Sequence, residues 1–159
     1  QVDDLLALED FDAAREDVER LRRRYPDSER IAELLTRIRR EADAFAERQR
    51  GEWFAEIDRH VEARRWPEAL EAAGRLVDRY PNSVEAQTVL PRMETLESNA
   101  RIALARDKRD RIRGLIERKR YGEAIRLGRE LIRELPETRA AAELRQQIPR
   151  LEDLARGRC

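Results

Sequence analysis

The sequence has little of what most catalytic and metal centres are made from. It contains one histidine, His60, and one cysteine, Cys159, which excludes an internal disulfide and a zinc site built from several Cys and His side chains. Its six glycines stand apart from one another and form no phosphate-binding loop. Acidic side chains are frequent, but they lie beside arginines at helix-surface spacing and are predicted to form solvated ion pairs. We therefore predict no catalytic residues, no metal and no cofactor.

The sequence also lacks a long apolar run, a secretory signal and a net charge. No stretch approaches the roughly 18 apolar residues of a membrane-spanning helix, and 34 basic residues balance 34 acidic ones. We therefore expect no direct membrane insertion and no global electrostatic field that would gather nucleic acid. The expected location is the cytoplasm, or else the soluble domain of a membrane protein.

Two further features bear on the origin of the chain. It opens at Gln1 rather than at an initiator methionine, so we expect a segment of a longer protein. Lysine occurs only at Lys108 and Lys119, and this strong bias toward arginine is typical of a GC-rich bacterial genome. For Cys159, the last residue, a segment boundary is the simpler explanation than a reactive thiol.

What the sequence does contain favours long helices. Charged residues make up 43% of the chain, while glycine and proline contribute six residues each. The hydrophobic 40% of the residues recur at spacings of three and four, which places them along one helical face. This periodicity predicts a folded all-α protein rather than a disordered chain.

A threefold internal repeat organises the chain. The segments RYPDS, RYPNS and ELPET place Pro26, Pro81 and Pro136 at a spacing of 55 residues. An aromatic residue precedes each proline by the same interval, so that the copies align as FDAAREDVERLRRRYPDS, WPEALEAAGRLVDRYPNS and YGEAIRLGRELIRELPET from residues 11, 66 and 121. Self-similarity at a fixed period indicates an array of structural repeats.

Each copy predicts a short helix, a sharp stop and a new start. Proline fixes φ and lacks an N–H group, so it ends the short helix or follows its end. Two residues later a hydroxyl side chain is placed to cap the next helix, at Ser28, Ser83 and Thr138. We expect short helices of about 14 residues, or about four turns. The tight turns are expected to make consecutive helices antiparallel neighbours.

The helices that follow these turns are predicted to be long. In residues 28–64 and 83–119 no cluster of turn-forming residues breaks the apolar pattern, so each stretch would extend about 54 Å as one helix. Pro91 is expected to bend the second helix without ending it. Gly51 and the pair Ser98–Asn99 are the weak points at which a long helix would fold back, and the sequence leaves that choice open.

Residues 118–136, RKRYGEAIRLGRELIRELP, resemble the second-helix half of a tetratricopeptide repeat (TPR). That family places an aromatic residue before an E-A-[IL] step, then small or apolar residues on the second helix and a closing proline. Tyr121, Ala124, Leu131 and Pro136 hold these places here, and the other two copies carry the same set.

Two departures from the family mark this chain as a stretched relative. The period is 55 residues rather than 34, although an insertion of about six helical turns keeps the apolar face in register. Ile57 and Ile112 stand where the family has a glycine between its two helices, and a bulky residue there must widen the helix pair or change its crossing angle.

The resemblance implies an all-α, TPR-like α-solenoid of three helix-pair repeats. Long helices of about 30–36 residues would alternate with short helices of about 14 residues. The expected organisation is one helical-repeat domain, with repeat units 1–27, 28–82 and 83–137 and a closing helix at 138–157.

The resemblance also implies a function as a non-catalytic module for protein–protein interaction or scaffolding, with a protein or peptide as partner. In the family, the first helix of each repeat lines a groove. The matching candidates are Trp53, Phe54 and Asp58 in one unit and Arg106, Arg109 and Arg113 in the next. A second interpretation is that Phe54 simply packs against a neighbouring helix.

Other functions stay open at this point. Residues 106–120 carry eight basic residues against three acidic ones and would reach nucleic-acid phosphates, but the interleaved acids and scarce aromatics favour a protein partner over nucleic acid. A purely architectural spacer is a further alternative. Residues 3–19 are strongly acidic, so opposite charges in the two segments predict weak head-to-tail self-association.

Overall fold

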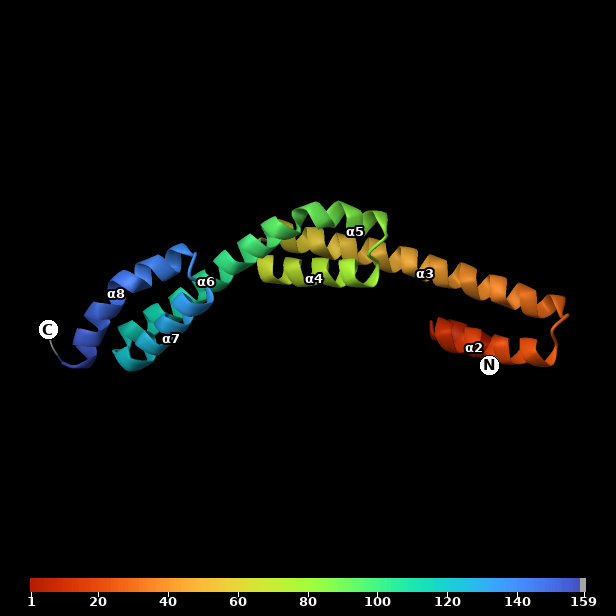
Figure 1. Ribbon diagram of the computed structural model, residues 1–159, viewed down its shortest axis with the longest axis horizontal. Helices are drawn as coiled ribbons and strands as arrows, with labels where there is room; N and C mark the ends of the chain where they lie inside the picture. Colours follow the sequence, from red (N-terminus) through yellow and green to blue (C-terminus); the bar gives the residue numbers. More distant parts are fainter. Residues whose placement is uncertain (158–159) are drawn as a thin grey trace. The chain divides into compact units, whose positions relative to one another are not determined.

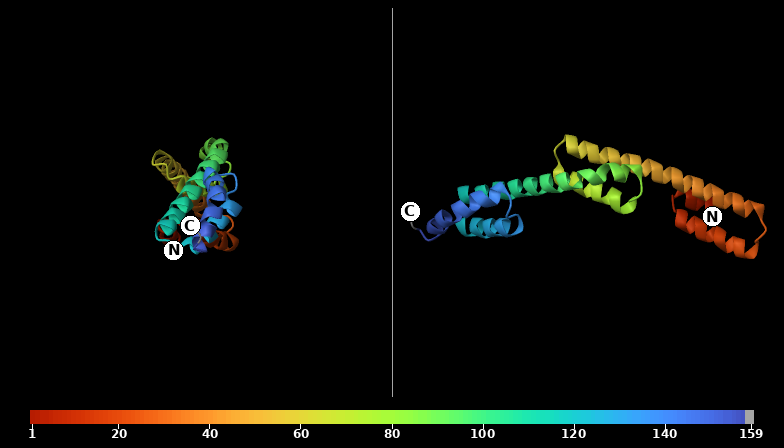
Figure 2. Two further views of the ribbon diagram at one scale, coloured as in Figure 1. Left: turned by 90° about the vertical axis from the view of Figure 1, so that its left-hand side faces the viewer. Right: turned by 45° about the horizontal axis from the view of Figure 1, so that its top comes forward.

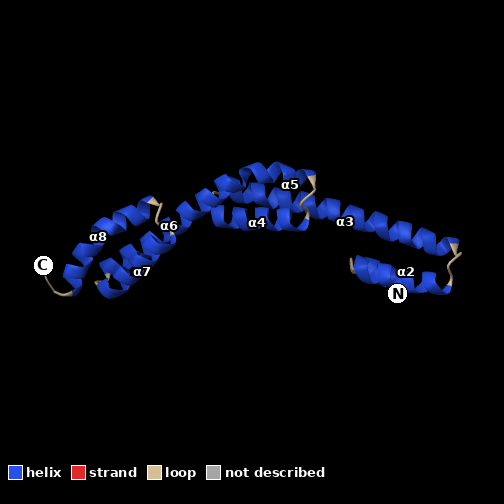
Figure 3. Ribbon diagram, viewed as in Figure 1, coloured by secondary structure: helices blue, strands red, loops and turns tan. Residues whose placement is uncertain are grey.

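The structure, a computed structural model, describes residues 1–157. Every regular element within that range is a helix, and the rest is turn and loop (Figure 3). The all-α prediction is confirmed, while Cys159 lies outside the described residues. The elements are α1 (Val2–Ala7), α2 (Phe11–Arg24), α3 (Glu29–Glu62), α4 (Trp66–Arg79), α5 (Val84–Val89), the 3₁₀ helix η1 (Leu90–Arg92), α6 (Met93–Glu117), α7 (Tyr121–Glu134) and α8 (Arg139–Ala155).

The short helices α2, α4 and α7 repeat with the period of the sequence. Each has 14 residues and begins at the aromatic position of its copy. Each ends two residues before the repeated proline, as predicted. Ala14, Ala69 and Ala124, which share one position in the three copies, are all 0% exposed. The same small side chain therefore lies at the tightest contact of each short helix.

A hydroxyl side chain joins the short helix to the next helix in the second and third copies. Ser83 Oγ accepts a hydrogen bond from Ala86 N–H at 3.1 Å and donates one to Tyr80 O at 2.7 Å. Thr138 Oγ1 makes the equivalent bonds at 3.3 and 2.7 Å, with the residues three places after and three places before it. The predicted helix caps are confirmed at Ser83 and Thr138.

The turn that leads into each short helix holds one residue in the left-handed region. These residues are Glu9 (φ 59°), Arg64 (φ 56°) and Lys119 (φ 62°), again 55 positions apart. The N–H of the next residue donates to the carbonyl five residues back, at 2.8–2.9 Å, which closes the end of the preceding helix. Glycine is the usual residue at such a position, so nothing in the sequence marked these turns.

The long stretches are continuous at both suspected weak points but not at the proline. Helix α3 runs for 34 residues through Gly51, and α6 passes through Ser98–Asn99 unbroken. The expectation for Pro91 is wrong, because the α-helix ends with α5 and resumes only with α6, and η1 lies between them. Proline cannot donate to the carbonyl four residues earlier and crowds it, and tighter 3₁₀ geometry replaces the α-helix there.

The chain divides into two compact units, and the division falls inside α3. Unit 1 comprises Gln1–Ala55 and unit 2 begins at Glu56. In unit 1, drawn from red to orange in Figure 1, the rings of Phe11 and Phe45 lie 5.5 Å apart between centroids and link α2 to α3. The buried cluster of this unit consists of Leu6, Ala14, Val18, Ile31 and Ile38. The expected organisation into one domain with three repeat units stays a prediction.

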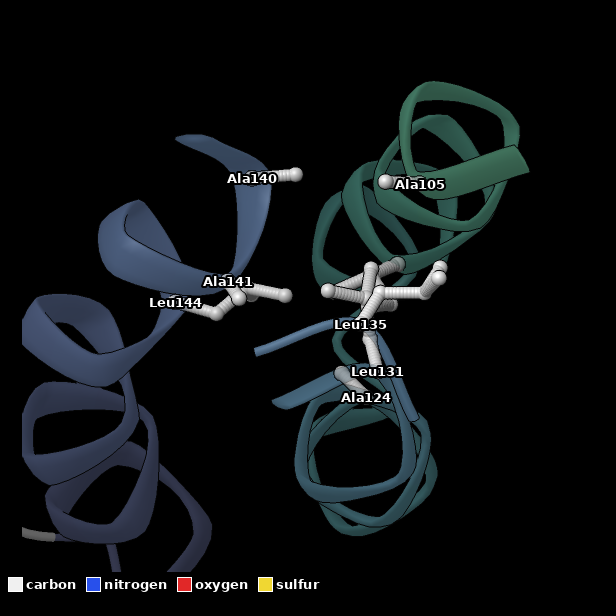
Figure 4. Close-up of a cluster of buried hydrophobic side chains, with 8 residues drawn as sticks. Ala105, Ala124, Leu131, Leu135, Ala140, Ala141 and Leu144 are labelled. Carbon is white, nitrogen blue, oxygen red and sulfur yellow. The ribbon is translucent and has the colours of Figure 1, made fainter. Parts of the chain in front are cut away.

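In unit 2, α7 packs against both α6 and α8 (Figures 1 and 2). Side chains from these three helices converge on one cluster, together with Leu135 from the turn after α7 (Figure 4). Ile57 and Ile112 are each 1% exposed, so the bulky residues at the family's glycine position are part of the core. The buried members of the α6–α7–α8 cluster are Ala105, Ile112, Ala124, Leu131, Leu135, Ala140, Ala141 and Leu144.

The cap at Thr138 provides a test of the turn. Thr138 is 7% exposed, so its hydroxyl has little access to water that could replace the two hydrogen bonds. We expect Thr138→Val, which keeps the shape and removes the oxygen, to lower the free energy of unfolding by about 1–2 kcal/mol. Thr138→Ser should retain most of the stability. Urea unfolding followed by circular dichroism measures both, and equal stability of the Val and Ser variants would contradict the assignment.

Candidate functional site

A groove lies between α6 and α8 in unit 2. It encloses a cavity of about 380 Å³, within the range of protein ligand pockets. Its floor is aliphatic, and its edge carries polar and charged groups. The floor residues are Ile112, Ile116, Leu144, Leu151 and Leu154, and the edge residues are Arg109, Arg113, Glu143, Gln147 and Arg150. We call this the α6–α8 groove.

A second hollow of about 630 Å³ lies between the same helices. Arg109 and Glu143 line both hollows, and Arg106, Ile102 and Thr138 line the second one. The two hollows are thus neighbouring parts of one surface on α6 and α8, with an aliphatic floor in the first and a more polar lining in the second.

The arginines of this surface differ in how their charge is balanced. Arg109 lies 3.8 Å from a carboxylate oxygen of Glu143 and 3.7 Å from one of Asp110, and its Nε is buried without a hydrogen-bond partner. Within residues 1–157, the side chains of Arg113 and Arg150 make no hydrogen bond or ion pair. Because Glu143 also pairs with Arg139 at 3.2 Å, the groove carries an excess of positive charge.

Closer to α7, the basic residues of α6 are paired. Lys108 Nζ lies 2.6 Å from Glu134 Oε2, and Arg101 Nε lies 2.5 Å from Glu137 Oε1. The hydrogen bond from Lys108 and then its charge lower the pKa of Glu134 below the ordinary value of 4.5. The hydrogen bond from Arg101 likewise lowers the pKa of Glu137. These pairs fasten α6 to the α7 end of unit 2 and leave the cations on the α8 side unbalanced.

Comparison with known proteins bears on the repeat. Residues 40–83, which cover the second half of α3, all of α4 and the turn that follows, match the tetratricopeptide repeat family. The chain is a TPR-like helical repeat protein. The matched segment includes the aromatic start at Trp66 and the turn from Pro81 to Ser83, both of which recur in the other copies of this TPR-like chain. No curated protein matches it.

The structure places the predicted binding residues of this TPR-like protein in two groups. Trp53 and Phe54 are half-buried side chains of unit 1. In unit 2, Arg106, Arg109 and Arg113 lie together on the α6 side of the two hollows. The remaining candidate, Asp58, pairs with Arg92 at 3.6 Å. The binding role of all six residues stays a prediction.

Sequence reasoning missed the α8 half of the groove. Gln147, Arg150 and Leu154 come from a helix more than 30 residues beyond the facing residues of α6, and no helical periodicity joins positions so far apart. A signal was nevertheless present in the 55-residue alignment, where Arg92 of the second copy becomes Gln147 in the third.

His60 is part of the repeat architecture. Arg65 Nε–H donates to its Nδ1 at 3.1 Å, and its Nε2 lies 3.5 Å from a carboxylate oxygen of Glu56. Its carbonyl accepts the hydrogen bond of Arg65 N–H that closes α3. Residues 1–157 contain no cluster of three or more His, Cys, Asp or Glu side chains suited to a metal ion. Over the same range, none of the helices has both the length and the apolar character needed to cross a bilayer.

The Lys108–Glu134 pair predicts a specific pH dependence. Because the folded pKa of Glu134 lies below 4.5, its stabilising effect is fully present above the unfolded pKa and is lost as pH falls through the folded value. We expect Glu134→Gln to lower the urea midpoint at pH 7 and to have no effect near pH 2.

Glu94→Gln is the matched control, because Glu94 is exposed on α6 and makes no ion pair among residues 1–157. It should leave the urea midpoint unchanged at both pH values. A loss in Glu134→Gln that was the same at pH 7 and pH 2 would show that packing, and not the ion pair, is responsible.

Proposed function

We propose that the protein is a non-catalytic protein-interaction module that acts as a scaffold and binds a protein or peptide in the α6–α8 groove. The observation that carries the proposal is the combination, in one groove, of an aliphatic floor with an edge of unbalanced arginines. A floor of this kind is suited to apolar side chains of a partner, and the edge fixes its orientation through charge.

The chemistry of the groove supports binding rather than catalysis. Its ionisable edge groups are three arginines and Glu143, and arginine stays protonated throughout the physiological range. Glu143 is held between Arg109 and Arg139, which favours its charged form and makes it a poor proton donor. The match to the tetratricopeptide repeat family, whose repeats serve protein binding, supports the same function.

Nucleic-acid binding is a second candidate, favoured by Arg106, Arg113 and Arg150, whose side chains are unpaired within residues 1–157. The aliphatic floor argues for protein, because phosphate backbones offer nothing to fill it, and neither hollow is lined by an aromatic side chain on which a base would stack. Phosphate binding would also weaken steeply with added salt. A spacer, the third alternative, would bind neither class of ligand.

A selection of peptides from a random library against the full chain tests the proposal. We expect selected peptides to lose at least about tenfold in affinity with Ile116→Asp, because a charge on the floor costs more than the apolar contact it removes. Ile116 is only half-buried, and circular dichroism checks that the variant is folded; Leu154→Asp serves as a second floor variant.

The matched control is Val84→Asp, since Val84 is an exposed aliphatic residue on α5, 80% exposed and outside both hollows. This variant should bind the selected peptides as the unmodified chain does. Peptides that bound all three variants equally would place the interaction elsewhere, and failure to select any peptide would favour the spacer.

A further inference from the structure

The 55-residue period places one ion pair at the same register in the first two copies. In unit 1, Arg37 Nη1 lies 2.6 Å from Asp3 Oδ1. In unit 2, Arg92 Nη1 lies 3.6 Å from Asp58 Oδ1. The positions correspond in the alignment, because 3 + 55 = 58 and 37 + 55 = 92. Each pair joins the helix before a short helix to the helix after it, within its own unit.

The third copy changes both partners of this pair. The position of Asp3 and Asp58 is occupied by Arg113, and the position of Arg37 and Arg92 by Gln147. The aspartate has thus become a cation while the arginine has become a neutral amide. Both residues line the α6–α8 groove, and the side chain of Arg113 makes no hydrogen bond or ion pair within residues 1–157.

Neighbouring groups do not restore the balance. Arg150, from the facing helix α8, is also unpaired within the described range and lines the same groove. Glu143 is the one acid at its edge, and it is shared by Arg109 and Arg139. The third copy therefore has the groove that the period creates, but lacks the carboxylate that would stand beside a cation in the first two copies.

We propose that the α6–α8 groove binds an acidic amphipathic helix of a partner protein, with a carboxylate of that helix at Arg113 and its apolar side chains on the groove floor. The proposal rests on the proposed function, because it names the partner chemistry of that site. Charge complementarity selects an acidic partner, and Gln147 offers an amide N–H to the same carboxylate.

The apolar floor and the two flanking helices select a helical partner. An apolar helix face fits a groove between two helices through residues spaced three and four apart. Ile116 and Leu154 are half-buried at the floor of the groove, so they retain surface that a partner would cover. A nucleic acid would satisfy the arginines but leave this aliphatic surface in water.

Three synthetic helical peptides with one shared leucine stripe test the proposal with the full chain. They differ only in the residues that flank the stripe, which are Glu, Gln or Lys. Fluorescence anisotropy is expected to show binding of the Glu peptide, at least about tenfold weaker binding of the Gln peptide, and no binding of the Lys peptide.

Variants of the chain locate the charge effect. Arg113→Asp, which installs the residue type of the first two copies, should weaken the Glu peptide by at least about a hundredfold, and Arg113→Gln by about tenfold. Arg126→Asp makes the same charge change on α7, at an exposed position outside both hollows, and should leave binding within about twofold. The double variant Arg113→Asp/Gln147→Arg rebuilds the ion pair and should also lose the Glu peptide while keeping the helical circular dichroism of the unmodified chain.

The outcomes separate this proposal from the function on which it rests. Equal binding of the Glu and Gln peptides, or equal losses for Arg113→Asp and Arg126→Asp, would overturn the acidic partner and leave groove binding intact. Selected library peptides that need Ile116 but carry no acids would do the same. Binding of a single-stranded oligonucleotide with steep salt dependence, and of none of the three peptides, would overturn both proposals.

Discussion

The fold depends on a turn in which one hydroxyl oxygen serves two helices. Ser83 and Thr138 each donate to the carbonyl that ends a short helix and accept from an amide in the first turn of the next helix. Without that oxygen, two backbone groups near the core would lose their partners. The turn also sets the direction and the rotational register in which the next helix starts. Since it recurs at a constant spacing, the face presented to the short helix recurs with it.

The core accommodates side chains of different size on this constant backbone. Val18, Ala73 and Gly128 occupy one aligned position, and all three are buried. A Cβ at Gly128 would meet Ile148 Cδ1 at 3.6 Å and Leu144 Cδ2 at 3.7 Å, so side chains of α8 come up to ordinary contact distance with the place that a larger residue would take. Volume lost from the short helix is thus supplied by its neighbour, as close packing requires.

Local signals account for the parts of the fold that the sequence predicted. A proline followed by a hydroxyl residue marks each turn through interactions only three residues long, and the short helices carry an apolar face with helical spacing. Two features escaped because their causes are not local in this sense. Glu9, Arg64 and Lys119 hold left-handed conformations without glycine, and the break at Pro91 reflects how far a proline in the second turn disturbs its own helix. In the candidate site, the α6 arginines were predicted and their α8 partners were not, because the groove is a tertiary contact.

Exposed ion pairs and buried aliphatic residues contribute very differently to stability, and this difference determines where the copies diverge. The Asp3–Arg37 and Asp58–Arg92 pairs are substantially exposed, so each stabilises the fold by about 0–1 kcal/mol. Burial of a residue such as Ile57 or Ile112 contributes about 1.5–3 kcal/mol. Exchanging an aspartate for Arg113 therefore costs the fold little, whereas the turn and the buried positions are under strong constraint. Residues that follow the period maintain the helical array, and residues that break it, as in the α6–α8 groove, are free to carry a binding specificity that the other copies lack.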